Sequence, residues 1–496
     1  MKTKSQSEEK TLDPQNWDET RATMHQMVDD AVDYMSGVRE RPIWQEIPED
    51  ILETFQLPVP RNGEGLGSVY SEFKTHILPY PMGNTHPRFW AWYMGNGTTT
   101  GVMGDFWASV INCNMGGGNH AGHKIEEQVV DWLKEIVGFP KDAGGLLVSG
   151  GSMANYTALA VARNVKLNYD VRKEGIRPNI ATKVRVYASS EIHSCNQKAL
   201  ELLGLGSDSL VKIKVNQDFT INLEALKEKI KEDRANGLLP ICVIGTSGTV
   251  NTGAIDNLEE LSKICIEEDL WFHIDGAIGA IAILSEKVKP LLKGIDLADS
   301  VAIDLHKWMH MPFEAACILI KDKQSHKDTF SLIPEYLEKN TRGVASGDNW
   351  FSEYGLQLSR RFRALKIWMS LKVHGADLFG EMISKNVEQA HYLEGLVNKS
   401  AELEMVAPVG LDIVCFRFNP GNLNLDELNS INKEIKLQLE ENAIAMPGYT
   451  TINGIYCIRV AICNHRSTFA DFDDLVFHIK RLGRELNQKE FFNSLN

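Results

Sequence analysis

The sequence lacks several features that would each place it in a definite class of protein. Residues 1–13 are polar and of mixed charge, without the apolar core of a secretory signal. The longest apolar run, around residues 277–284, contains a glycine and is far too short for a membrane helix. The eight cysteines form no CxxC pair, and we interpret them as free thiols in a reducing compartment. These absences predict a cytoplasmic protein without a membrane partner, a disulfide framework or a metal site.

The sequence also has fewer basic than acidic residues. The chain has 52 Lys and Arg residues against 66 Asp and Glu residues, a net charge of −14. An acidic protein repels polyanions, so nucleic acid and anionic membrane surfaces are excluded as main partners. Because 43% of its 496 residues are hydrophobic, the chain can bury a large core in two or three structural units. Small-molecule chemistry is the class of function left open.

The hydrophobic pattern predicts three regions. Residues 1–85 form a helical segment, with helices at 24–38 and 51–57. In residues 86–375, short β-rich runs alternate with amphipathic helical segments, which predicts a large α/β domain with a mostly parallel sheet between helices. Residues 376–496 form a small α+β domain. The predicted strands of the large domain are 145–148, 184–188, 211–215, 241–245, 271–275, 301–304 and 315–320.

The segment Ser149-Gly150-Gly151-Ser152 follows the first of these strands and precedes a predicted helix. Two glycines let backbone N–H groups approach an anion, and the helix N-terminus adds its dipole. The alternative is a tight turn in which Ser152 caps the helix. Because neither a P-loop motif nor a complete GxGxxG occurs here, a nucleotide-binding fold gains little support.

Three more reactive side chains follow predicted strands: His193, Asp275 and Lys307. Asp275 could bind magnesium, cap a helix or hold a cationic nitrogen. Lys307 either reaches solvent or, partly desolvated, forms a Schiff base. His193 taken alone is more typical of a core or surface position. Together with the glycine turn, however, the three match the needs of pyridoxal phosphate: an anion cradle, a carboxylate for the ring nitrogen, a lysine for the aldehyde and a flat partner for the ring.

Further motifs occur in order along the chain. They are His86-Pro87-Arg88-Phe89, Ser149-Gly150-Gly151-Ser152-Met153-Ala154-Asn155, Glu191-Ile192-His193-Ser194, Gly248-Thr249-Val250-Asn251-Thr252-Gly253-Ala254-Ile255-Asp256, His273-Ile274-Asp275-Gly276-Ala277, Ala298-Asp299-Ser300, His306-Lys307-Trp308 and Arg360-Arg361-Phe362-Arg363. With these motifs the sequence resembles the group II pyridoxal-phosphate-dependent amino acid decarboxylases, which include aromatic L-amino acid and glutamate decarboxylases. The resemblance covers most of the chain and implies the type I fold of pyridoxal-phosphate enzymes, pyridoxal 5'-phosphate as cofactor and a homodimer.

The resemblance also implies roles for individual residues. Lys307 would be the Schiff-base lysine and Asp275 the partner of the pyridinium nitrogen. His193 would stack on the ring, with Ala277 on its other face. The other residues placed around the cofactor are Gly151, Ser152 and His306 at the phosphate, and Thr249 and Asp304, where Asp304 replaces a common asparagine.

A catalytic tyrosine is expected on a mobile loop. In the family, a tyrosine in a Pro-x-Tyr-Leu pattern protonates Cα after CO₂ has left, and Pro334-Glu335-Tyr336-Leu337 matches that pattern. Residues 343–347, which follow, contain the Gly and Ser typical of a flexible segment. The alternative for Tyr336 is an ordinary loop aromatic.

The substrate is predicted from aromatic residues between positions 89 and 107. This region lines the substrate cleft in the family, and its aromatic density favours an aromatic L-amino acid, although core packing explains aromatics equally well. Arg88 and His120 leave an acidic amino acid open. The expected substrate contacts are Trp92, Tyr93, Gly95 and His120, with Gly95 where the aromatic decarboxylases place a threonine.

Three other activities fit the same residues. An aldehyde synthase of the family usually lacks the loop tyrosine that Tyr336 supplies. An aminotransferase would share Lys307 and Asp275 but would not release CO₂. A binding protein without activity is disfavoured because every essential cofactor residue is present.

Overall fold

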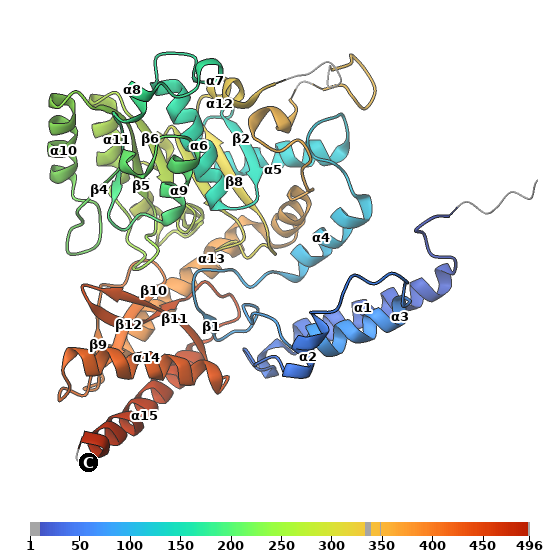
Figure 1. Cartoon of the computed structure of the whole chain (residues 1–496), viewed down its shortest axis with the longest axis vertical. Coiled ribbons are helices and arrows are strands. Elements are labelled where there is room, and N and C mark those ends of the chain that lie inside the picture. Colours follow the sequence, from blue (N-terminus) through green and yellow to red (C-terminus); the bar gives the residue numbers. More distant parts are fainter. Residues whose placement is uncertain (1–9, 333–338, 348, 495–496) are drawn as a thin grey trace, which may run out of the picture. The chain divides into compact units, whose positions relative to one another are not determined.

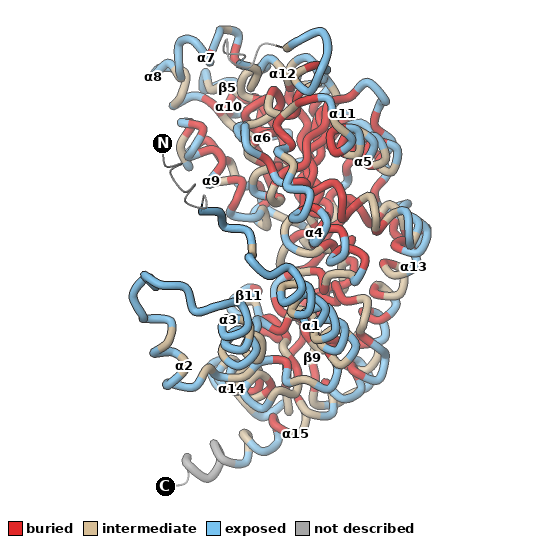
Figure 2. Tube along the Cα trace, turned by 90° about the vertical axis from the view of Figure 1, so that its right-hand side faces the viewer, coloured by how far each residue is buried: buried red, intermediate tan, exposed pale blue. Residues whose placement is uncertain are grey.

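The computed structural model describes residues 10–332, 339–347 and 349–494, and the chain divides into two units, Met1–His86 and Pro87–Asn496. In the first unit, helix α1 (Trp17–Ser36) starts earlier than predicted because the Asn16 side chain accepts hydrogen bonds from the N–H groups of Asp18 and Glu19. Helices α2 (Glu49–Thr54) and α3 (Leu66–Glu72) and a π-helical turn (Phe73–Ile77) follow. None of these three α-helices contains a buried residue, as Figure 2 shows.

The second unit is built around a seven-stranded sheet with the order β2-β8-β7-β6-β5-β3-β4 (Figure 1). Every pairing from β7 to β4 is parallel, and β8 runs antiparallel to both of its neighbours. The predicted mostly parallel sheet is therefore confirmed. Its strands are β2 (Gly144–Val148), β3 (Val184–Ser189), β4 (Leu210–Ile213), β5 (Leu239–Thr246), β6 (Trp271–Asp275), β7 (Ser300–Asp304) and β8 (Ala316–Ile320).

Helices cover both faces of this sheet because successive side chains of each strand point to opposite faces. In β2, Leu147 packs with Val129 and Leu133 of one helix layer, whereas Leu146 and Val148 pack on the other face. The first layer contains α5 (Ala121–Val137), α10 (Leu223–Ala235) and α11 (Leu258–Glu267), and the second contains α6 (Gly151–Lys166) and α9 (Ser194–Leu202).

The small C-terminal domain has its own sheet and core. Helix α13 (Ala364–Asn398) leads into it and is interrupted at Gly375, where φ is 75° and the backbone leaves the helical region. The sheet order is β1-β11-β12-β10-β9, so β1 (Phe89–Trp90) pairs with a strand more than 350 residues later in the chain. The remaining elements are β9 (Leu403–Met405), β10 (Ile413–Phe418), α14 (Leu425–Glu441), β11 (Met446–Ile452), β12 (Ile455–Ala461) and α15 (Phe469–Ser494).

Two features are absent from the described residues. No helix among them combines the length and apolarity needed to cross a membrane. No group of three or more His, Cys, Asp and Glu side chains in these residues is placed to hold a metal ion. In open parallel sheets, ligands bind at the carboxyl ends of the strands. Here β2, β3, β5, β6 and β7 all end at one edge of the sheet.

Candidate active site

A cavity of about 360 Å³ lies at this edge, lined by the segments that follow β2, β3, β5, β6 and β7. The parallel order of the strands brings together five segments that are far apart in the sequence. Nearly all of the residues predicted to surround a cofactor line this cavity, namely Gly151, Ser152, His193, Asp275, Ala277, Asp304, His306 and Lys307.

The glycine turn after β2 leads directly into the N-terminus of α6. Gly150 is extended and the helix begins at Gly151, so Ser152 lies in the first turn and is not the cap. The Gly151 N–H donates a hydrogen bond to Asp304 Oδ2 at 3.2 Å. A Cβ at position 151 would lie 3.0 Å from that oxygen and 3.1 Å from Ala277 Cβ, so the close packing favours glycine. The N-terminus of α6, with the positive end of its helix dipole, therefore faces the cavity and already holds the Asp304 carboxylate through the Gly151 N–H.

Asp304, His306 and Lys307 form a charged group at the end of β7. Lys307 Nζ lies 3.5 Å from Asp304 Oδ2, and His306 Nε2 lies 3.2 Å from Asp304 Oδ1. The Ala315 N–H donates to His306 Nδ1 at 3.2 Å, so the proton of the neutral ring is on Nε2 and faces the carboxylate. Burial lowers the pKa of His306. Lys307 therefore has its amine inside the cavity and its counter-ion already in place.

Asp275, at the end of β6, has different surroundings. Its side chain is buried, with Oδ2 accepting from Asn196 Nδ2 at 2.8 Å and Oδ1 from the Ala277 N–H at 3.3 Å. In the described part of the chain, no Lys, Arg or His nitrogen lies within ion-pair distance of this carboxylate. A buried charge without a partner is costly, so the cavity favours a cationic group next to Asp275.

His193 stands where β3 leads into α9. Its Nδ1 accepts the Cys195 N–H at 3.2 Å, so the side chain caps the helix and the neutral ring has its proton on Nε2. Burial is the main cause that lowers the pKa of His193, so the ring is neutral at pH 7. A neutral, flat ring fixed at the rim of the cavity can stack on another ring without adding charge.

Thr249 is the predicted cofactor residue that the structure places outside the cavity lining. Its hydroxyl lies 2.9 Å from Thr252 Oγ1 and accepts the Ala254 N–H at 3.0 Å, so it holds the loop after β5 in a tight turn. Thr246 and Val250 line the cavity from this segment instead. The sequence analysis also assigned no site role to Glu191 and Cys195, which line the cavity, or to one asparagine on each of the helices α6 and α9. Those two are Asn155 and Asn196, one helical turn after Gly151 and His193, and that spacing was the available signal.

The four predicted substrate residues do not line this cavity. Trp92 is 57% exposed, with φ at 52°. Tyr93 is buried, and its hydroxyl donates to Asp412 Oδ2 at 2.9 Å, where burial raises the pKa of Asp412 to about 7. His120 is the N-cap residue of α5. Any contact of these side chains with substrate stays a prediction.

Gly95 contacts the lysine segment through its backbone. Its N–H donates to the His306 carbonyl at 3.0 Å. A Cβ at this position would lie 2.3 Å from the Lys307 carbonyl oxygen and 2.9 Å from His310 Cα, distances that side chains do not adopt. A threonine therefore cannot stand here with this backbone, and glycine lets the segment after β1 pack directly against Lys307.

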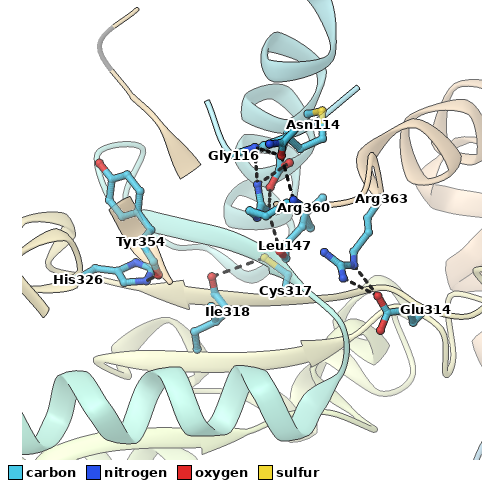
Figure 3. A network of polar contacts seen from close by, with 12 residues as sticks. Asn114, Gly116, Leu147, Glu314, Cys317, Ile318, His326, Tyr354, Arg360 and Arg363 are labelled. Atoms are coloured by element: carbon cyan, nitrogen blue, oxygen red, sulfur yellow. Dashed lines mark hydrogen bonds and ion pairs between the residues drawn. The ribbon is translucent and has the colours of Figure 1, made fainter. Parts of the chain in front are cut away.

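The motif that begins at Arg360 contacts the sheet at β2 through Leu147 (Figure 3). Arg360 is buried and donates to the carbonyls of Met115 and Leu147 at 2.8 and 2.7 Å. It also forms a bidentate ion pair with Glu126. Burial raises the pKa of Glu126, and the Arg360 guanidinium offsets only part of that rise. Because Leu147 is in β2, Arg360 fixes the strand that precedes the glycine turn.

The predicted proton donor, Tyr336, lies outside the described residues. Of the segment after it, residues 343–347 are described, and the Ser346 N–H donates to the Gly343 carbonyl at 3.1 Å in a turn with positive φ at both glycines.

Comparison with known proteins identifies the scaffold. A family profile, the pyridoxal-dependent decarboxylase conserved domain, matches residues 48–419. The chain is 37% identical to an aromatic-L-amino-acid decarboxylase of Bacillus atrophaeus over 477 residues, which cover 95% of this chain and 96% of the relative. It is 31% identical to tyrosine decarboxylase 4 of Petroselinum crispum, with 93% and 92% covered. The crystal structure of Oryza sativa TDC with PLP and tryptamine has the same fold, with a TM-score of 0.88 at 23% identity over 96% of this chain and 100% of that one.

Proposed function

Since the chain belongs to the pyridoxal-dependent decarboxylase family, and is therefore a decarboxylase that uses pyridoxal 5'-phosphate, we propose that its substrate is an aromatic L-amino acid. The product would be the corresponding amine and CO₂. The observation that carries this proposal is the cavity in which a lysine amine, an unpaired buried carboxylate and the N-terminus of a helix converge.

The residues present fit the cofactor. The buried carboxylate of Asp275 lacks a cation, which the protonated ring nitrogen would supply. The N–H groups at the start of α6 suit the phosphate, and the Lys307 amine would bind the aldehyde carbon. We propose that His193 and Ala277 contact the two faces of the ring, and that His306 lies beside the phosphate.

When bound, pyridoxal phosphate accepts the electron pair that remains at Cα as CO₂ leaves. Asp275 favours this by holding a proton at the ring nitrogen through its negative charge. His193 is neutral, so it does not form an ion pair with the carboxylate that must depart, and the ground state is not stabilised at the expense of the reaction. The Asp304 carboxylate, 3.5 Å from the Lys307 amine, would orient that amine within the cavity.

The aromatic substrate is supported by the names of the relatives and by the state of Arg88. Its guanidinium pairs with Asp471 at 3.0 Å and Asp474 at 2.8 Å, both near the start of α15. Arg88 is thus engaged with two carboxylates, which disfavours it as the receptor for an acidic side chain.

A screen for CO₂ release from the common L-amino acids, with added pyridoxal phosphate, tests the proposal. We expect kcat/KM for the best aromatic substrate to exceed that for glutamate or aspartate by about 100-fold or more. A preference for glutamate would overturn the aromatic assignment and leave the decarboxylase intact.

Tyr336 is our proposal for the residue that protonates Cα. Tyr336→Phe is expected to release CO₂ but to form aldehyde instead of amine when the reaction runs in air. The measurement is the amine-to-aldehyde ratio against wild type. If amine is still the dominant product at a normal rate, another group donates the proton.

We further propose a cytoplasmic homodimer. Helix α4 (Thr99–Ile111) exposes Met103, Phe106 and Trp107, and α1 exposes Met24 and Val28, so both helices offer apolar surface to a second copy. The eight cysteines are free thiols, which suits a reducing compartment. Sedimentation at working concentration tests the dimer, and an active monomer would contradict it.

A further inference from the structure

Asn196 lies behind the carboxylate that faces the cavity. It is fully buried in the first turn of α9, and its Nδ2 donates to Asp275 Oδ2 at 2.8 Å. The other oxygen of Asp275 is held by the Ala277 N–H. Each carboxylate oxygen thus has one donor, and both donors are neutral.

The position of Asn196 is fixed by His193. The Asn196 N–H donates to the His193 carbonyl at 3.1 Å, and the His193 ring caps the same turn through Cys195. One helical turn therefore sets both the ring at the rim of the cavity and the donor behind Asp275.

The Asn196 side chain is not optimised for stability. Its Oδ1 is buried and has no hydrogen-bond partner among the residues that the structure describes, whereas its Nδ2 donates to Asp275 and lies 3.5 Å from the His193 carbonyl. A buried acceptor left unpaired costs about 1–3 kcal/mol. The opposite orientation of the amide would set two acceptor oxygens against each other. A position chosen for packing alone would be filled more stably by an apolar residue, so the cost indicates a functional requirement for the donor.

An amide is the residue type that such a requirement selects. Lysine or arginine would neutralise Asp275 and compete with a cationic ligand, and an acid would repel it. The amide N–H stabilises and orients the negative charge while leaving it available.

We propose that Asn196 is a positioning residue that aims the charge of Asp275 at the ring nitrogen of the cofactor. This rests on the proposed function, in which Asp275 faces that nitrogen. Asn196 touches neither cofactor nor substrate in this assignment, and it acts through Asp275.

The test compares Asn196→Leu, which keeps the size but removes the donor, with Asn432→Leu in the full-length protein. Asn432 is also fully buried, and its amide hydrogen bonds to Phe418 lie in the small domain. We expect Asn196→Leu to weaken binding of pyridoxal phosphate on the order of 10- to 100-fold and to lower kcat with little change in KM. The control should lose thermal stability while its cofactor affinity and kcat stay near those of wild type.

A cofactor analogue isolates the mechanism. In 1-deazapyridoxal phosphate a carbon replaces the ring nitrogen, so Asp275 has no cation to hold. The affinity difference between wild type and Asn196→Leu should therefore shrink to less than about threefold with this analogue. Asn196→Ala, which leaves a small void instead of a misfit, repeats the comparison in case leucine is not accommodated. An unchanged dissociation constant for pyridoxal phosphate in either folded variant overturns the proposal, as does an equal loss with both cofactors. Failure of the proposed contact between Asp275 and the ring nitrogen is distinguishable, because wild type itself would then bind pyridoxal phosphate and its 1-deaza analogue with equal affinity.

Discussion

The neighbouring parallel strands β6 and β7 each end in a buried aspartate that lines the cavity, but the surroundings of the two carboxylates differ. At the β6 end, Asp275 is held by the neutral N–H groups of Asn196 and Ala277. At the β7 end, Asp304 lies against the Lys307 amine and the His306 ring, with the Gly151 N–H on one oxygen. The same residue type at equivalent positions therefore has two electrostatic roles. The carboxylate of Asp275 is left to pair with a cationic ligand, whereas the carboxylate of Asp304 already pairs with Lys307 of the protein.

Among these substitutions, removing the Lys307 amine beside Asp304 should lower kcat the most. Lys307→Ala eliminates the group that binds the aldehyde carbon, and we expect kcat to fall by about 10³-fold or more. The visible band of the bound cofactor should disappear. Lys307→Arg keeps the positive charge beside Asp304 and should be equally inactive but closer to wild type in thermal stability. Activity in either variant with an unchanged band would show that Lys307 is not the cofactor lysine.

Asp275→Asn tests the carboxylate that is held by neutral N–H donors. The amide keeps the shape but has no charge for the ring nitrogen, so kcat should fall by about 10²- to 10³-fold while some cofactor is retained. The readouts are single-turnover CO₂ release and the cofactor dissociation constant. Near-normal turnover would mean that another residue faces the nitrogen.

Gly95→Ala disturbs the support of the lysine segment without changing a charge. The added Cβ would collide with the Lys307 carbonyl at 2.3 Å, so the segment must shift, and we expect a 10- to 100-fold loss of kcat, about what a displacement near 1 Å costs. Gly395→Ala is the matched control, since no atom of the described part of the chain lies within 4 Å of a Cβ there. That control should be as active as wild type and slightly more stable, because alanine favours helix. Wild-type kinetics for Gly95→Ala would show that the contact does not position Lys307.

Asp304→Asn replaces the other aspartate by the same amide and should change kcat the least. The amide oxygen can still accept the Gly151 N–H, so kcat should change by less than about tenfold. Because a negative charge is removed from the N-terminus of α6, pyridoxal phosphate should bind more tightly. The comparison predicts opposite signs for the cofactor affinity of Asp275→Asn and Asp304→Asn. Weaker binding of pyridoxal phosphate in both variants would contradict the different roles assigned to Asp275 and Asp304.

Much of the site could be predicted from the sequence because its residues directly follow strands. Asp275, Lys307 and the glycine turn each come after a short apolar run, and alternating strands and helices make the sheet parallel. Asn196 and Asn155 were missed because they lie one turn inside helices, where their spacing from His193 and Gly151 is the local signal of a buried role. Thr249 was assigned to the cavity, but its hydroxyl closes its own loop.

The sequence by itself determined the strands, the helices and which edge of the sheet collects the reactive side chains, because hydrophobic periodicity and local motifs act over a few residues. Only the tertiary structure decided which of those side chains are paired. Asp304 has its charged neighbours His306 and Lys307 close by in the sequence, but Asp275 receives its donor from Asn196, 79 positions away. The Gly151 N–H that contacts Asp304 comes from 153 positions away. Two other contacts depend in the same way on packing between distant segments. They are the close approach of Gly95 to Lys307 and the ion pair between Arg88 and Asp471. The charge of a buried group is set by the few atoms around it, and those atoms are assembled only when the chain folds.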